Sequence, residues 1–217
     1  MTRIAMVGGT GAMGKGLGYR FAVAGHDVVL GSRSADRAAD AAAEVSEHAG
    51  TPVEGRANTD AVRWAEIVVV AVPYDGHTAL IESLAGALTD RVVVSCVNPL
   101  GFDRAGAYAL DVPDHSAAEE TARLAAGARV VGAFHTVSAV SLWRHEGPLD
   151  HEDVLVCGDD ADAKGLVVDL AATAVGRPGV DVGPLRQSRQ LEPLTAMLIS
   201  VNKRYRTRAG IRIGGLP

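Results

Sequence analysis

Aromatic residues, cysteine and basic charge are all scarce in this sequence. Only 4% of the 217 residues are aromatic, which disfavours a site that holds bases or sugars by stacking. The two cysteines, Cys96 and Cys157, lie in apolar runs, so we expect reduced, buried thiols rather than a disulfide or a reactive site. Lys and Arg number 21 against 26 Asp and Glu, a net charge of −5, and this balance disfavours nucleic acid as a partner.

Long apolar segments are absent as well. The longest apolar run, residues 67–73, is far shorter than the about 20 residues that span a membrane. The N-terminus carries no charged segment followed by an apolar one, the pattern of a signal peptide. The sequence therefore predicts a cytoplasmic protein with no membrane partner. Its length predicts one domain, or one domain with a small extension.

Glycine is abundant, with 25 residues, and short apolar strands alternate with helical patterns along the chain. This alternation predicts an α/β fold built on a Rossmann-type, doubly wound parallel sheet with helices on both faces. Loops are expected at 101–116 and 135–152, and the natural seam of the chain lies near 139–152. The expected strands are 4–7, 27–30, 52–54, 66–72, 91–97, 129–134, 154–157 and 180–182, and the expected helices are 15–24, 36–48, 59–64, 77–88, 116–126, 161–175 and 187–206.

Local signals support three of these helices. Ser116, followed three residues later by Glu119, forms a capping box at the start of one helix. Asp159 or Asp160 is a suitable N-cap for the helix that begins at 161. The last helix carries an apolar stripe at helical spacing, made of Leu191, Leu194, Leu198 and Val201.

The chemistry of the chain is concentrated in a glycine-rich turn directly after the first strand. The turn contains the run Gly9-Thr10-Gly11-Ala12-Met13-Gly14, which matches G-x-G-x-x-G. Alone the motif is weak, but here it follows a strand, opens a helix and lies in a βαβ unit. We expect Gly9 to permit the tight turn, Gly11 to let the backbone approach a pyrophosphate, and Gly14 to allow close helix packing. The pyrophosphate would meet the free N–H groups of the helix N-terminus.

The end of the second strand indicates which dinucleotide binds. In an NAD site an acidic residue stands there and bonds the ribose 2′-hydroxyl. Here the strand ends in Ser32 and Arg33, and no acid occupies the tip. A hydroxyl and a guanidinium suit a 2′-phosphate, and Arg37 and Thr10 could add further donors. The sequence therefore predicts NADP(H) rather than NAD(H).

Other strand ends should face the same crevice, because ligands bind at the carboxyl ends of strands in such sheets. Val72 and Pro73 follow one strand, and their position suits backbone contact with ribose and nicotinamide. His135 follows another strand, and its role is equally open between structural and functional. The chain has no Tyr-x-x-x-Lys pair, no Ser-His-Asp pattern and no cluster of metal ligands. A nucleotide site without an acid/base pair suits hydride transfer between two carriers, which needs mainly alignment.

Five segments resemble one family, the deazaflavin-dependent NADP oxidoreductases, also described as NADPH:coenzyme F420 reductases. The first two segments, which NADP-binding relatives share more widely, are Gly8–Leu17 and Gly25–Arg33. The more discriminating segments are Ala133–Ala139, Leu191–Thr195 and Asn202–Tyr205. The resemblance spans nearly the whole chain, and the chain length suits the family.

The resemblance implies reversible hydride transfer between NADP(H) and coenzyme F420, an 8-hydroxy-5-deazaflavin. It implies an NADP-binding Rossmann domain at 1–139, and a small C-terminal α/β-helical domain at 140–217 that forms the deazaflavin cleft and the contacts of a homodimer. His135 and Ser138 would orient the rings, and relatives can carry Lys in place of Arg37. The cofactor-binding residues it predicts are Gly9, Thr10, Gly11, Ala12, Met13, Gly14, Ser32, Arg33, Arg37, Val72, Pro73, His135, Val137, Ser138 and Ala139.

Two alternatives remain open on the sequence. One is another NADPH-dependent reductase, acting on a flavin, a ferric chelate or an imine, built on the same fold. The other is a non-catalytic sensor that binds NADP(H) and regulates a partner. The contacts of the deazaflavin tail are also open, with Arg186, Ser188 and Arg189 as suggested residues.

Overall fold

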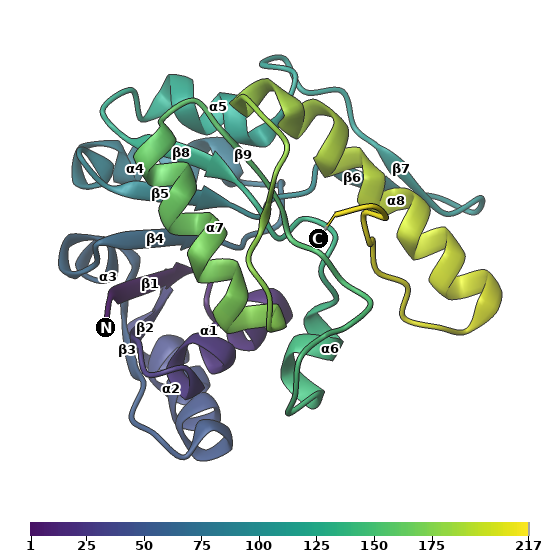
Figure 1. The fold of residues 1–217 in the computed structure, drawn as a ribbon. Helices are drawn as coiled ribbons and strands as arrows, with labels where there is room; N and C mark the ends of the chain where they lie inside the picture. Colours follow the sequence, from purple (N-terminus) through teal and green to yellow (C-terminus); the bar gives the residue numbers. More distant parts are fainter. Residues whose placement is uncertain (217) are drawn as a thin grey trace.

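A central sheet of eight strands organises the computed structural model, which describes residues 1–216 (Figure 1). The strand order is β10-β9-β8-β5-β4-β1-β2-β3. Every neighbouring pair is parallel except β8 with β9. The six strands from β3 to β8 have the order of a dinucleotide-binding sheet. The strands are β1 (Arg3–Val7), β2 (Asp27–Ser32), β3 (Glu54–Ala57), β4 (Ile67–Val70), β5 (Val92–Ser95), β8 (Arg129–Gly132), β9 (Leu155–Gly158) and β10 (Val180–Asp181).

Helices cover both faces of the sheet, as predicted. The side chains of β1 alternate between the two layers, with Ile4 and Met6 in one buried cluster and Ala5 and Val7 in the other. The first cluster includes residues of α1 (Ala12–Val23), α2 (Ala35–Ala49) and α7 (Ala161–Val175). The second includes residues of α3 (Asn58–Trp64), α4 (His77–Leu88) and α5 (Ala117–Leu124). Because both faces are covered, the central strands β4 and β5 are buried along their whole length.

The sheet departs from the predicted wholly parallel arrangement at one pair. Strand β9 runs antiparallel to β8, with Val131 opposite Gly158 and Gly132 opposite Cys157. The connection from β8 to β9 contains no helix that crosses the face of the sheet, so the chain returns in the opposite direction. Helix α7 then supplies a crossover, and β10 is parallel to β9. The sheet therefore continues past residue 139, and the division into two domains stays a prediction.

Two short features lie in segments predicted as loops. A hairpin forms from β6 (Leu100–Phe102) and β7 (Ala107–Ala109), which are antiparallel. Helix α6 (Ala139–Arg144) follows β8 and packs against α1. Both elements were wrongly predicted as loop because they are too short to show a period in the sequence.

The last helix, α8 (Ser188–Tyr205), follows a 3₁₀ turn η1 (Leu185–Gln187), and its second half extends with the hairpin away from the sheet (Figure 1). Of the predicted stripe, Leu191 is buried, whereas Val201 is exposed. Both cysteines are free and buried, which confirms the prediction of reduced core thiols. Within residues 1–216, no helix is long and apolar enough to cross a membrane.

Candidate functional site

The loop between β1 and α1 is shaped by glycines, with one correction to their predicted roles. Gly8, rather than Gly9, has the left-handed conformation, with φ of +80°, so Gly8 makes the tight turn. Gly9 is needed for a different reason, because a Cβ there would lie 2.8 Å from the Met6 carbonyl oxygen and 2.9 Å from Leu30 Cβ. The loop therefore lies tightly against the strand β2.

Gly14 and Gly11 differ in what surrounds them. A Cβ at Gly14 would lie 2.7 Å from Gly9 Cα, so α1 packs closely against the loop. A Cβ at Gly11 would meet only the Gly8 oxygen, at 3.5 Å, so the space in front of Gly11 is open. Gly11 is the N-cap of α1, and no side chain caps this helix. The first N–H groups of α1 are thus directed at open space, an arrangement suited to a pyrophosphate.

Ser32 and Arg33 lie together at the end of β2, as predicted. Ser32 is buried, and its hydroxyl accepts a hydrogen bond from the Ser34 N–H at 3.3 Å. Arg33 is exposed, and Arg37 is exposed in the first turn of α2, whose N-cap is Ser34. Two guanidinium groups beside a hydroxyl form a site of the right chemistry for a phosphate.

A cavity of about 410 Å³ opens next to Ser32 and Arg33. Its other walls come from the start of α3, with Asn58 and Thr59, and from α4, with Leu80. The size and the mixed lining are typical of a site for a small organic group. The sequence did not indicate the α3 and α4 residues, because they reach this cavity only through the sheet order.

Val72 lies against the glycine loop, since a Cβ on Gly8 would be 2.5 Å from Val72 Cγ1. Behind this strand end, His77 is fully buried and its Nδ1 lies 2.9 Å from a Glu120 oxygen. His77 Nε2 lies 3.0 Å from Thr121 Oγ1. Burial lowers the pKa of His77, which favours the neutral ring. The His77–Glu120 pair joins α4 to α5 and fixes the segment that begins at Val72. This pair was not predicted from the sequence.

The turn after β8 is strained and buried. Phe134 has φ of +63° and is 1% exposed, and strained residues of this kind cluster at functional sites. His135 is 3% exposed. Its carbonyl oxygen accepts hydrogen bonds from Asn98 Nδ2 at 2.9 Å and Thr195 Oγ1 at 2.7 Å. These bonds tie β8 to the segment after β5 and to α8.

The His135 ring is held without polar partners. Among the described residues, neither ring nitrogen has a hydrogen-bond partner. Burial lowers the pKa of His135 to about 4, so the ring is neutral at pH 7. A Cβ added to Gly132 would touch this ring together with Ser188 Oγ and Cys157 Sγ. The structure therefore places the His135 ring inside the protein. Beside it, Cys157 Sγ and Ser188 Oγ form a hydrogen bond of 3.1 Å.

Ser138 connects the predicted ring-lining segment to a buried carboxylate. Its N–H donates to a Glu152 oxygen at 2.9 Å, and its hydroxyl accepts from the Ser141 N–H as the N-cap of α6. Glu152 is 1% exposed, and burial raises the pKa of its carboxyl group. Val137 is buried and Ala139 is partly exposed. Sequence reasoning did not select Glu152, because a lone acidic residue in a loop is usually solvated.

The structure brings most of the predicted residues to one edge of the sheet. Ala12 and Ala139 line the same cavity, of about 190 Å³, so the glycine loop and the segment after β8 are neighbours. Of the residues suggested for the deazaflavin tail, Ser188 is fully buried, Arg186 is exposed, and Arg189 makes a two-bond ion pair with Glu119.

The strand order, the open helix N-terminus at Gly11 and the basic residues at the end of β2 define an NADP-binding oxidoreductase fold. The sequence profile of the family described as NADP oxidoreductase, coenzyme F420-dependent, matches residues 3–99. An F420-dependent NADP reductase of Methanothermobacter thermautotrophicus is 39% identical, with 99% of this chain and 96% of the relative covered. One from Methanocaldococcus jannaschii is 35% identical, with 99% of each chain covered. This chain therefore belongs to the family of coenzyme F420-dependent NADP oxidoreductases.

Solved structures agree with this assignment. A candidate F420-dependent NADP reductase from Arthrobacter sp. FB24 superposes with a TM-score of 0.84 at 25% identity, over 99% of this chain and 100% of that one. A reductive aminase from Aspergillus terreus gives a TM-score of 0.65 at 20% identity, over 95% of this chain and 63% of that one. The second likeness shows a shared fold alone.

Proposed function

We propose that this protein transfers a hydride between NADP(H) and coenzyme F420. The observation that carries the proposal is the identity of 35–39% to three proteins named F420-dependent NADP reductase over 99% of this chain. The two coenzymes supply the chemistry, since the hydride passes between the nicotinamide and the deazaflavin ring. This function is favoured over that of another NADPH-dependent reductase because all three full-length relatives are named F420-dependent NADP reductase, whereas the likeness to the reductive aminase is limited to the fold.

The nucleotide-binding residues fit NADP(H). The open space at Gly11 leaves room for a pyrophosphate at the N-terminus of α1. At the end of β2, Arg33 provides charge for the 2′-phosphate, Ser32 provides a hydroxyl, and Arg37 lies one helical turn further on. The cavity beside Arg33 would hold the adenosine part of the coenzyme. These residues bind the coenzyme and select NADP(H) over NAD(H).

The residues near the reacting rings act by orientation. Val72 and Pro73 provide a wall against the nicotinamide side, held by the buried His77–Glu120 pair. Val137, Ser138 and Ala139 line the other side. His135 is neutral and buried, so its role is to hold the turn after β8 through its carbonyl oxygen. Positioning of two reactants accounts for several kcal/mol of barrier lowering without a proton donor.

A direct assay tests the proposal. NADPH is mixed with oxidised F420 and the protein, and the loss of the deazaflavin visible band is followed. We expect rapid loss with NADPH and much slower loss with NADH. An unchanged deazaflavin spectrum, with NADPH consumed only when a flavin, ferric chelate or imine is added, would assign the protein to another class of reductase.

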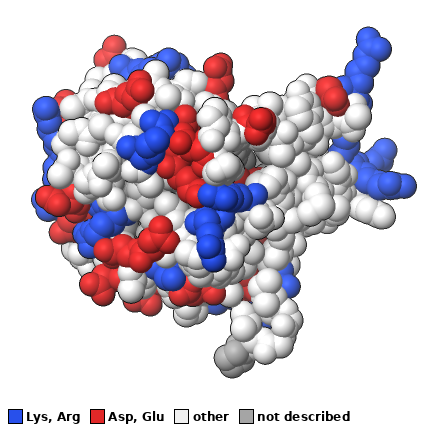
Figure 2. Space-filling model, turned by 90° about the horizontal axis from the view of Figure 1, so that it is seen from above, with Lys and Arg blue, Asp and Glu red and all other residues white. Residues whose placement is uncertain are grey.

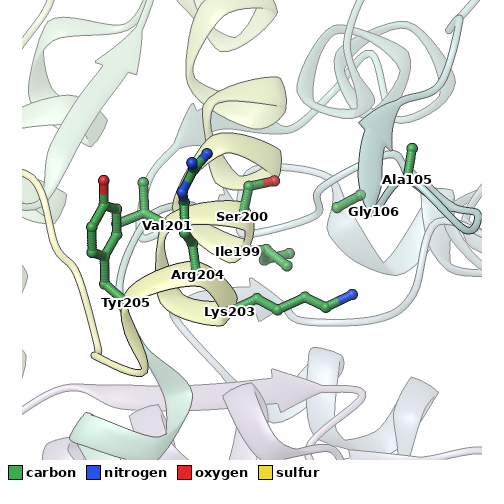
Figure 3. Close-up of a pocket in the computed structure, with 9 residues that line it drawn as sticks. Ala105, Gly106, Ile199, Ser200, Val201, Lys203, Arg204 and Tyr205 are labelled. Atoms are coloured by element: carbon green, nitrogen blue, oxygen red, sulfur yellow. The ribbon is translucent and has the colours of Figure 1, made fainter.

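We further propose that the protein is a homodimer, supported by exposed apolar side chains on one projecting part of the molecule. Met197, Val201 and Tyr205 on α8 are 61%, 37% and 70% exposed, and Phe102 and Tyr108 of the hairpin are 68% and 47% exposed. We call these five side chains the arm face. An open groove of about 710 Å³ lies between the turn of the hairpin and the second half of α8, and its lining residues are drawn in Figure 3. In Figure 2 this projecting part is largely uncharged, with basic side chains near its end. An apolar surface of this kind marks an interaction site.

Sedimentation velocity tests the dimer. The variant Met197→Glu with Tyr205→Glu places two charges on the arm face and should sediment as a monomer, whereas the natural sequence sediments as a dimer. Leu166→Glu is the matched control, because Leu166 is 50% exposed on α7, away from the arm face. A monomeric natural sequence would overturn the proposal. We also propose a cytoplasmic location, supported by the two free thiols.

A further inference from the structure

A second basic region lies away from Arg33 and has no role in the binding of NADP(H) described above. It is a groove of about 610 Å³ between α6 and the chain that follows α8. Arg144 at the end of α6 forms one wall, and Arg206 and Arg208 form the other. Among the described residues, no Asp or Glu lines the groove, although the whole chain carries a net charge of −5. We call this groove, with Arg144, Arg206 and Arg208 in its walls, the basic groove.

The three arginines of the basic groove are available to a ligand. All three are exposed. Within residues 1–216, none of the three forms an ion pair, whereas Arg123, Arg177 and Arg189 elsewhere on the surface each face a carboxylate. Guanidinium groups gathered without a counter-charge repel one another, and an anion that enters relieves this repulsion.

Both walls of the basic groove are fixed by specific contacts. At the end of α6, the buried Arg20 donates to the His145 carbonyl at 3.0 Å. After α8, the chain reverses at Arg206, whose φ is +51°, and the Ala209 N–H donates to Asn202 Oδ1 at 2.6 Å. Further on, Asp153 accepts from the Ile213 N–H at 2.8 Å. The charges are thus placed on ordered backbone, which lowers the entropic cost of binding.

The basic groove adjoins the predicted ring-lining segment. Ser141, which lines the groove, donates its N–H to Ser138 Oγ at 3.2 Å. His151, also in the lining, precedes Glu152, which accepts from the Ser138 N–H at 2.9 Å. The phosphate-binding end of β2 is a different place, with its own cavity beside Arg33. A ligand whose ring lies at Ser138 and whose charged end extends along α6 would reach the arginines.

We propose that the basic groove binds the anionic tail of the deazaflavin coenzyme, through the tail's phosphodiester and glutamate carboxylates. The inference rests on the proposed function, because it takes coenzyme F420 as the second substrate. Arginine suits both anions, since its fork geometry matches carboxylate and phosphate oxygens. The basic groove therefore contributes affinity for the coenzyme that carries the tail. The ring-lining segment instead orients the rings for hydride transfer.

The test measures the binding of three ligands to a double variant and to a control variant. The double variant Arg144→Gln with Arg208→Gln removes two charges and leaves Arg206, whose left-handed backbone makes it a structural residue. Arg63→Gln is the control, because Arg63 is exposed in the last turn of α3, away from the groove. The ligands are F420 with several glutamates, the same deazaflavin without its phosphate and glutamate tail, and NADPH. Dissociation constants come from deazaflavin fluorescence without NADPH, and KM values come from the direct assay of the deazaflavin visible band.

We expect the double variant to weaken binding of the tailed coenzyme about tenfold, about threefold for each arginine. Binding of the tail-less deazaflavin and the KM for NADPH should stay within about twofold, and added salt should reduce the effect. Equal weakening of the tailed and tail-less ligands, no change in either, or a raised KM for NADPH alone would overturn the proposal. A natural sequence that reduces neither deazaflavin would instead refute the proposed function, and the binding titration separates the two results.

Discussion

Glu152 and Ser138 are joined by a hydrogen bond of 2.9 Å from the Ser138 N–H to the Glu152 carboxylate, inside the protein. Gly210 packs directly on the Glu152 side chain, because any Cβ at Gly210 would overlap it. The buried Glu152 side chain thus connects Ser138, in the segment proposed to line the rings, to the chain that follows α8. Its neighbour Asp153 reinforces this by binding the N–H of Ile213.

Replacement of Glu152 should therefore affect stability and the deazaflavin site together. Glu152→Ala leaves the partly buried Ser138 N–H without its acceptor, which costs about 1–3 kcal/mol of unfolding free energy. Glu152→Gln keeps an acceptor oxygen and should cost less. Urea unfolding measures the first effect, and the KM for F420 should rise in the alanine variant. If both variants unfold like the natural sequence, the bond has no stabilising role.

Gly11 and Gly14 give a matched pair for the nucleotide site. Gly11→Ala adds a Cβ into open space, so thermal stability should be unchanged while the KM for NADPH rises about tenfold or more, since the methyl group meets the pyrophosphate. Gly14→Ala adds a Cβ 2.7 Å from Gly9 Cα and should lower the unfolding free energy by about 1–3 kcal/mol. Thermal unfolding and steady-state kinetics check both. Normal NADPH kinetics in Gly11→Ala would place the pyrophosphate elsewhere.

Arg33 should determine the preference for NADPH. The loss of its charged hydrogen bonds in Arg33→Ala should weaken NADPH binding by about 1.5–3 kcal/mol. Binding of NADH should change little, because NADH lacks the 2′-phosphate. Calorimetry with both coenzymes measures the difference, with Arg63→Ala as the control. The hypothesis fails if the natural sequence already binds the two coenzymes equally.

Glu192 should make stability depend on pH. It is 2% exposed and accepts hydrogen bonds from the Ala117 and Ala118 N–H groups at the start of α5. Burial raises the pKa of Glu192 from 4.5 to about 8. The folded protein therefore retains this proton at a pH where the unfolded chain has lost it. The group's contribution is full below the unfolded pKa and is lost as the pH rises toward the folded value.

The comparison with Glu192→Gln isolates this effect. The glutamine keeps an acceptor for α5 and does not titrate. Relative to the variant, the natural sequence should lose up to about 1.4 kcal/mol of unfolding free energy for each pH unit between the two pKa values. Urea unfolding at several pH values from about 5 to about 8 measures the slope. A difference that does not vary with pH would show that the carboxyl group is ionised throughout.

Regular elements with strong local signals could be predicted from the sequence. The helix over 77–88 and the helix over 161–175 have the predicted bounds, and Asp160 is the N-cap of the second. Ser116 is confirmed as the N-cap, because its hydroxyl accepts from the Glu119 N–H. The second bond of a capping box is not formed, since the Glu119 carboxylate accepts from the Ser116 hydroxyl and from Arg189. In each case the decisive contacts are close in sequence, so the pattern itself contains the information.

Features that depend on distant partners could not be predicted. Glu152 and Glu192 are buried because backbone N–H groups at Ser138 and at Ala117 reach them across the fold. The antiparallel direction of β9 depends on a connection from β8 that does not cross the face of the sheet, which no local period encodes. The glycine motif was recognised correctly, yet the left-handed residue is Gly8, because the turn begins one residue earlier than the motif.

The exposure of Arg33 has a consequence for how this enzyme family can diversify. Its side chain is exposed at the end of β2 and supports no part of the core. If Arg33 binds the 2′-phosphate, as proposed, a substitution there would change the accepted coenzyme without removing a core contact, so selection on metabolism could act on this position. Ser32, buried beneath it, does not have that freedom. Under the proposed function, coenzyme choice is thus an evolvable trait that depends on an exposed residue outside the core.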